Sequence, residues 1–135
     1  MPLTVEDRLE ITDLVARYNH AVDRGDGEAF ADTFTDDGAL DAAGRLIEGR
    51  AALAAFAKGL PGSVRVPRHI ASNLVMEGDG EAGQATLAAY VQMYALAGDP
   101  PRQEVVASGL YDDQLAKVDG RWRFVRRVFV PDSGR

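Results

Sequence analysis

The chain contains no cysteine, and this absence excludes several kinds of chemistry. Without thiols there is no disulfide, no thiol nucleophile, no cysteine-based zinc site and no ligand set for an iron–sulfur cluster. Only two histidines are present, neither beside a close-spaced group of carboxylates, so the sequence predicts no metal site. Phosphate loops, dinucleotide-binding fingerprints and Gly-x-Ser-x-Gly motifs are also missing. We therefore expect a protein that works without a cofactor.

Positive charge and long apolar runs are scarce as well. Lysine and arginine number 15 against 21 aspartate and glutamate residues, which gives a net charge of −6 at pH 7. An acidic surface is a poor match for nucleic acid or for an anionic membrane, so neither is expected as a partner. No apolar run approaches the roughly 18 residues of a membrane helix, and the N-terminal sequence lacks the pattern of a signal peptide. These features predict a cytoplasmic protein.

The 135 residues suffice for one domain with a buried core, and its first part is patterned as helices. Thr4 is typical of a helix start, apolar side chains then recur on one face, and Gly25 suits a left-handed helix end, which together predict a helix over 4–24. The elements expected next are a short helix that Asp26 caps and that buries Phe30 and Phe34, a turn at 35–38, a hairpin of 39–41 with 45–47, and a helix over 50–58 that Gly59 to Gly62 end.

The second part of the chain is patterned as strands. Turn sequences separate four apolar-rich segments, at about 68–76, 82–96, 103–117 and 121–130. Helices followed by an antiparallel meander predict an α+β fold. In the last segment, alternation places Trp122, Phe124, Val128 and Val130 on one face, and Arg121, Arg123, Val125, Arg127 and Phe129 on the other. Because neither face is wholly polar, we expect the helices on one side and a second copy on the other, in a homodimer or homotrimer.

Two residues stand out as candidates for acid–base chemistry. Asp23 lies in the last turn of the first helix, where the helix dipole disfavours a carboxylate, so it needs a hydrogen-bond donor, a cation or a function. The alternative is a solvated acid paired with Arg17 or Arg24. His69 begins the first predicted strand and can exchange a proton near neutral pH, or else it is a half-buried histidine bonded to the main chain. His20 points away from the apolar face and is expected at the surface.

Other side chains could line a ligand site, although core packing explains most of them equally well. Phenols that could orient a carbonyl or hydroxyl belong to Tyr18, Tyr90, Tyr94 and Tyr111. Candidates for the core first and for a pocket second are Phe34, Phe56, Met76, Met93 and Trp122. Arg126 and Arg127 either balance an anion or, as we expect, pair with surface acids.

The order of these elements, and six short motifs, resemble the SnoaL-like branch of the superfamily named for nuclear transport factor 2. The motifs are ITDLVARY (11–18), AVDRGD (21–26), FTDDG (34–38), IEGR (47–50), RHIASN (68–73) and DGRW (119–122). The resemblance covers nearly the whole chain and implies one NTF2-like domain over 1–135, a cone-shaped α+β barrel with three N-terminal helices packed on a strongly curved, mostly antiparallel sheet. The superfamily includes dehydratases, isomerases, cyclases, dehydrohalogenases, epoxide hydrolases and noncatalytic subunits.

Scytalone dehydratase and hexachlorocyclohexane dehydrochlorinase, within this superfamily, resemble the chain at two functional positions. Both use an aspartate near the end of the first helix to orient a histidine on the strand after the third helix, and those positions fall on Asp23 and His69. Val22 stands where scytalone dehydratase has a tyrosine, and Tyr111 falls near its late-strand asparagine. The resemblance thus implies His69 as a general base and Asp23 as its orienter, with Tyr18 and Tyr111 as candidates to bind a substrate oxygen.

Two functions follow as hypotheses. The first is a cofactor-independent lyase or isomerase, of dehydratase or cyclase type, acting on a small, largely apolar, oxygenated ring compound. The alternative is a noncatalytic module that binds a small ligand or serves as an assembly subunit, like the β subunits of ring-hydroxylating dioxygenases. A separated Asp23 and His69 would favour the alternative.

Overall fold

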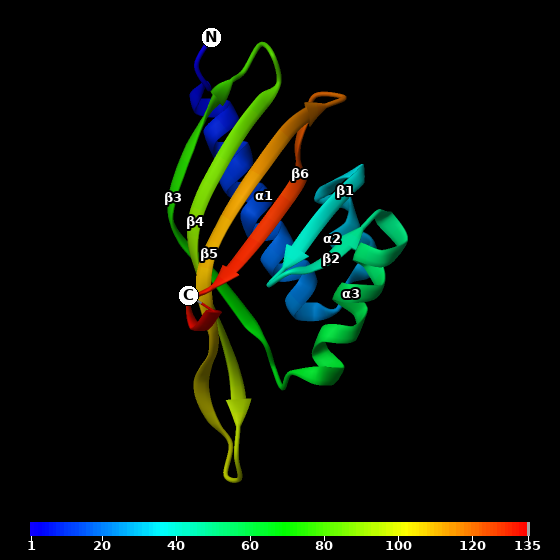
Figure 1. Ribbon diagram of the computed structural model, residues 1–135, viewed down its shortest axis with the longest axis vertical. Helices are drawn as coiled ribbons and strands as arrows, with labels where there is room; N and C mark the ends of the chain where they lie inside the picture. The colour runs from blue at the N-terminus through cyan, green and yellow to red at the C-terminus, as the bar shows by residue number, and fades with distance from the viewer. Residues whose placement is uncertain (135) are drawn as a thin grey trace.

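The first helix, α1 (Val5–Arg24), is capped at both ends as the sequence predicts. The structure is a computed structural model and describes residues 1–134 (Figure 1). Thr4 and Asp7 form a capping box, in which each side chain accepts a hydrogen bond from the main chain of the other at 3.0 Å. Gly25 ends the helix with a φ of 70°. The buried apolar face consists of Ile11, Leu14, Val15, Tyr18, Ala21 and Val22.

The second helix, α2 (Gly27–Asp32), is shorter than expected, because Phe34 does not belong to it. Asp26 caps this helix and accepts a hydrogen bond from the main chain of Ala29 at 3.1 Å. Phe34 instead opens β1 (Phe34–Ala42), and the predicted turn at 35–38 lies within this strand. The pairing of β1 with β6 shifts register between Phe34 and Ala39. The turn-forming residues thus bulge out of the strand without ending it.

The third helix, α3 (Arg50–Ser63), follows β2 (Arg45–Glu48) and continues beyond the predicted end at residue 58. Pro61 lies in its last turn, where a proline removes only one internal hydrogen bond. The proline ring packs on the end of α1, since a Cβ added to Gly25 would lie 3.0 Å from Cγ of Pro61. Leu60 packs against the core. These contacts offset the poor helix propensity of the glycines and the proline.

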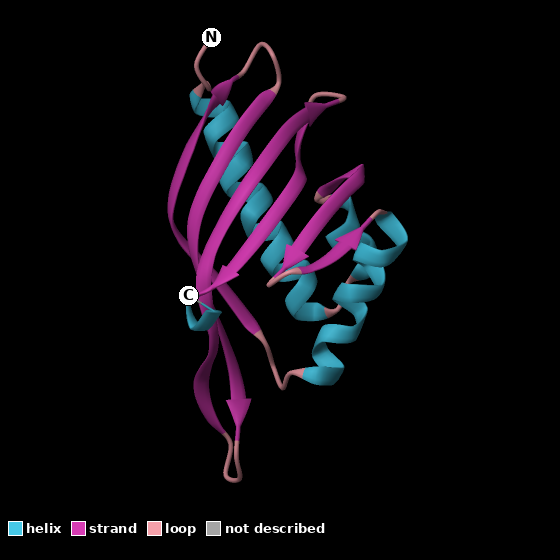
Figure 2. Cartoon of the chain, in the orientation of Figure 1, coloured by secondary structure: helices cyan, strands magenta, loops and turns pink. Residues whose placement is uncertain are grey.

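The four predicted strands are confirmed, with ends that differ by at most a few residues. They are β3 (Arg68–Asp79), β4 (Gln84–Ala97), β5 (Arg102–Val118) and β6 (Arg121–Pro131), and a short 3-10 helix, Asp132–Gly134, follows. Together with β1 and β2 they form a sheet of order β2-β1-β6-β5-β4-β3, in which only the pairing of β1 with β6 is parallel. The sheet curves over the helices (Figure 2). The mostly antiparallel α+β expectation is confirmed.

The expected alternation of β6 is wrong beyond Val125. Phe124 is opposite Leu115 and Arg126 is opposite Gln114, so Val125 is an extra residue in the strand. Such a bulge exchanges the two faces for all residues that follow. Arg127 therefore lies inside with Phe124, both with no exposed surface.

The core lies between α1 and the sheet and is rich in aromatic rings. Neighbouring ring centroids of Tyr18, Phe30, Phe34, Phe124 and Tyr111 are 4.8 to 6.1 Å apart. Apolar side chains that stay exposed on the strands include Leu46, Ile70, Val75, Tyr90, Val105, Val106, Val118 and Val130. Among residues 1–134, none of the helices is both long and apolar enough to cross a membrane.

Candidate active site

The end of α1 meets the start of β3, and this junction brings Asp23 and His69 together across 46 positions of sequence. One carboxylate oxygen, Oδ1, lies 2.6 Å from Nδ1 of the His69 ring. The other, Oδ2, accepts a hydrogen bond of 3.0 Å from the main-chain N–H of His69. The side chains are only 10% and 13% exposed. One carboxylate thus holds both the ring and the backbone of the histidine.

These contacts explain why a carboxylate occupies the unfavourable end of a helix. Arg17, one of the expected alternative partners of Asp23, instead binds Asp13, with 2.6 Å between Nε and Oδ2. Asp23 binds His69. Because an ionised carboxylate only accepts hydrogen bonds, Nδ1 carries the hydrogen in the neutral ring. Nε2 then keeps its lone pair and is the nitrogen available to a ligand. His20, the other histidine of the sequence, is exposed as predicted.

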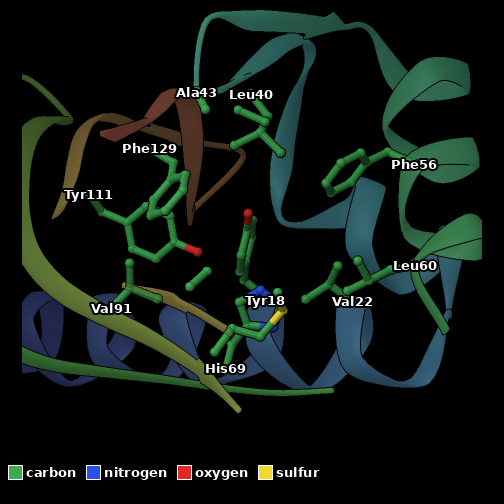
Figure 3. Close-up of a pocket in the computed structure, with 13 residues that line it drawn as sticks. Tyr18, Val22, Leu40, Ala43, Phe56, Leu60, His69, Val91, Tyr111 and Phe129 are labelled. Atoms are coloured by element: carbon green, nitrogen blue, oxygen red, sulfur yellow. The ribbon is translucent and has the colours of Figure 1, made fainter. Parts of the chain in front are cut away.

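His69 lines a pocket of about 210 Å³ between the helices and the inner face of the sheet (Figure 3). Its other walls are two phenols and a set of apolar side chains: Tyr18, Tyr111, Val22, Leu40, Ala42, Ala43, Phe56, Leu60, Val91, Met93, Ala107 and Phe129. The volume suits a molecule of one or two small rings. Phe56 and Met93 thus line the pocket, whereas Phe34 and Trp122 are buried in the core.

The pocket brings Tyr18 and Tyr111 close to each other, as the two candidates for binding oxygen. Both are nearly fully buried, their ring centroids are 6.0 Å apart, and Figure 3 shows both hydroxyls directed into the pocket. Burial raises the pKa of each phenol, so both are hydrogen-bond donors at neutral pH. Tyr90 is 56% exposed, and the hydroxyl of Tyr94 lies 3.4 Å from Oε1 of Gln92. Neither of these tyrosines lines the pocket.

Beneath the phenols lies a buried charged pair that the sequence pattern does not predict. Nε of Arg127 donates to Oδ1 of Asp113 at 3.1 Å, and neither side chain has more than 1% exposure. The expected pairing of Arg127 with surface acids is therefore wrong, because the bulge at Val125 turns the residue inward. Arg126, on the opposite face, lies 3.5 Å from the partly exposed Asp41 as expected. A signal in the sequence is the pair of acids, Asp112 and Asp113, within the apolar-rich strand segment 103–117.

The buried position also changes the ionisation of Asp113. Burial raises the pKa of this carboxyl to about 7, although the positive charge of Arg127 acts in the opposite direction.

Within residues 1–134, no group of three or more histidine, aspartate and glutamate residues is arranged to hold a metal ion. Among the residues that line the pocket, the polar side chains are the imidazole of His69 and the phenols of Tyr18 and Tyr111.

Comparisons with known proteins identify the family of the chain. The family model of the SnoaL-like domain matches residues 3–128 of this chain. An uncharacterized protein of Mycobacterium tuberculosis, Rv2910c, is 32% identical over 127 residues, which cover 92% of this chain and 84% of that protein. The solved structure of a variant of Rv3472, a protein of unknown function from the same organism, has a TM-score of 0.85 and 34% identity, covering 93% of this chain and 72% of that one.

An NTF2-like protein with a cystatin-like fold from Novosphingobium aromaticivorans is also similar, with a TM-score of 0.88 and 25% identity, covering 97% of this chain and 85% of that one. The fold and the order of elements match the expectation from the six motifs. With a match that spans nearly all its residues, the chain belongs to the SnoaL-like domain family and has the NTF2-like α+β cone.

Proposed function

We propose that the protein is a cofactor-independent lyase or isomerase in which His69, oriented by Asp23, removes a proton from a small, apolar, oxygenated ring compound. The observation that carries the proposal is the 2.6 Å contact of Nδ1 with Asp23 on a histidine that lines a mostly apolar pocket. A base works best when its tautomer is fixed and water is largely excluded.

The reaction begins with transfer of a proton from a carbon beside a carbonyl group to Nε2 of His69. Asp23 stabilises the imidazolium that forms, because its carboxylate accepts the hydrogen bond from Nδ1. The electron pair of the broken C–H bond moves onto the carbonyl oxygen, and the resulting enolate accepts hydrogen bonds from Tyr18 and Tyr111. In a lyase the enolate then expels a neighbouring hydroxyl, which leaves as water with the proton from His69. In an isomerase His69 returns the proton to another carbon.

Pocket size and lining favour the substrate class. A pocket of about 210 Å³ is too small for large or extended molecules. Its apolar walls offer few groups that could compensate for the desolvation of a highly charged molecule. The phenols supply hydrogen bonds for one oxygen.

An elimination probe tests the proposed base without knowledge of the natural substrate. In 5-nitrobenzisoxazole a base takes the ring C–H proton, the N–O bond breaks, and a coloured phenolate forms. We expect the wild-type protein to accelerate this reaction and His69→Gln to remove the acceleration. The matched control is His20→Gln, on the exposed side of α1, which should keep it. Equal rates for His69→Gln and wild type would overturn the proposal.

A second candidate is a noncatalytic module that assembles with itself as a homodimer or homotrimer or with another subunit. The exposed apolar side chains on β3 to β6, such as Val75 at 62% and Tyr90 at 56%, favour an assembly role. Binding of small ring compounds that His69→Gln leaves unchanged, with no elimination by wild type, would favour this candidate.

A further inference from the structure

The guanidinium of Arg127 is stacked on the ring of one pocket phenol and close to another. Its Cζ lies 3.4 Å from the ring centroid of Tyr111 and 4.4 Å from that of Tyr18. A third ring, that of Phe124, is 4.5 Å away. Distances of this kind are typical of cation–π contacts, in which the positive charge interacts with the electron-rich face of a ring.

This arrangement leaves most of the guanidinium without hydrogen-bond acceptors. Arg127 has no exposed surface, and its Nη1 and Nη2 have no hydrogen-bond partner among residues 1–134. Nε alone is bound, by Asp113. Burial of a charged group is costly unless other groups compensate for the lost water, and here the ring faces and one carboxylate oxygen do so. A leucine or methionine would fill the same space without this cost, so packing does not explain the arginine.

The positive charge acts on the phenols that it contacts. A cation on the face of a ring draws electron density from the ring and its oxygen, which makes the hydroxyl a stronger donor toward a negative acceptor. For Tyr111, burial raises the pKa, and the charge of Arg127 is the largest effect that opposes this rise. Both hydroxyls point into the pocket, so the effect reaches a bound ligand (Figure 3).

We propose that Arg127 is a positioning residue that acts through Tyr18 and Tyr111, and that it adapts this pocket to a ligand oxygen bearing negative charge, such as that of an enolate or a phenolate. This role of Arg127 rests on the proposed function, in which the pocket binds the substrate. It explains why an apolar cavity is built over a buried cation. Arg127 itself touches the rings and not the ligand.

The test is a binding measurement that needs no turnover. The probes are para-nitrophenol, whose ionisation is visible by absorbance, and nitrobenzene, which has nearly the same shape and no charge. We expect wild type to prefer the phenolate over nitrobenzene, and Arg127→Met to reduce this preference by about tenfold or more. Arg127→Lys, which keeps the charge, should restore part of it. Arg126→Met is the matched control on the same strand and should not change it.

Two further variants decide the matter if Arg127→Met does not fold. Tyr111→Phe and Tyr18→Phe leave the guanidinium in place and remove one hydroxyl each, and both should reduce the preference for the phenolate. An unchanged preference in the folded Arg127→Met protein, or in both phenylalanine variants, would overturn the inference. Failure of the proposed function gives a different result, because elimination would then be independent of His69 while the phenolate preference still depended on Arg127.

Discussion

Replacing Asp23 by asparagine changes the chemistry of the dyad and little of its shape. The amide oxygen can still accept the hydrogen bond from the main-chain N–H of His69, which is 3.0 Å long in the wild-type protein. The junction of α1 and β3 is therefore retained. The amide NH2 group, however, faces Nδ1 and donates to it. The hydrogen of the neutral imidazole then moves to Nε2, the nitrogen that must accept the substrate proton.

The size of the effect follows from the one contact that is lost. A hydrogen bond to a charged group contributes about 1.5–3 kcal/mol, and each 1.36 kcal/mol of activation energy changes a rate by about tenfold. Loss of the bond between Asp23 and the imidazolium therefore predicts a decrease of about 10- to 150-fold. The wrong tautomer adds to this, so we expect kcat/KM to decrease by roughly a hundredfold or more.

The assay is elimination of 5-nitrobenzisoxazole, followed by absorbance. Asp13→Asn is the matched control, since this exposed acid of α1 binds Arg17 and lies outside the pocket. Thermal unfolding should give similar midpoints for wild type and both variants, which would show that an activity loss is not a folding defect. An Asp23→Asn protein as active as the Asp13→Asn control would refute the assigned role of the carboxylate.

Three other predictions concern stability, the pocket and assembly. Hydrogen bonds, first that from the main chain of Thr4, lower the pKa of Asp7 from 3.8 to about 2. The ionised carboxylate therefore contributes to the free energy of unfolding above pH 3.8, and this contribution is lost as the pH falls toward 2. Urea unfolding should show Asp7→Asn less stable than wild type by about 2 kcal/mol at pH 7 and nearly equal to it near pH 2. Ala107→Leu should fill part of the pocket and lower the elimination rate roughly tenfold without unfolding the protein, as melting curves can check. Sedimentation should give a mass above the 14.5 kDa of one chain, and Val75→Lys with Tyr90→Lys should shift it toward that value; a wild-type monomer would contradict the predicted homo-oligomer.

Most of the fold could be predicted because its signals are local. The cap at Thr4, the glycine at 25 and the turns between the strands specify where elements begin and end, within a few residues. The sequence pattern predicts too short a helix α3, because its last turn depends on a tertiary contact of Pro61 with the end of α1, which local propensity does not contain.

The inner face of β6 could not be predicted, because a bulge depends on the pairing of two strands. Simple alternation assigned Arg127 to the opposite face, and a single extra residue, Val125, reverses the assignment. The buried pair of Arg127 with Asp113 was missed for that reason. By contrast, Asp23 and His69 lie at the ends of well-predicted elements, and the family resemblance indicated that those ends meet.

Proton exchange in a bound ketone tests the central claim, that His69 is a base facing the pocket, most directly. The cyclic ketone 2-tetralone has acidic protons beside its carbonyl group, and NMR in deuterated water follows their replacement by deuterium. Once binding of the ketone has been shown by titration, wild type and His20→Gln should accelerate the exchange, whereas His69→Gln should bind the ketone and exchange it at the rate of buffer alone. Equal acceleration by wild type and His69→Gln would contradict the account.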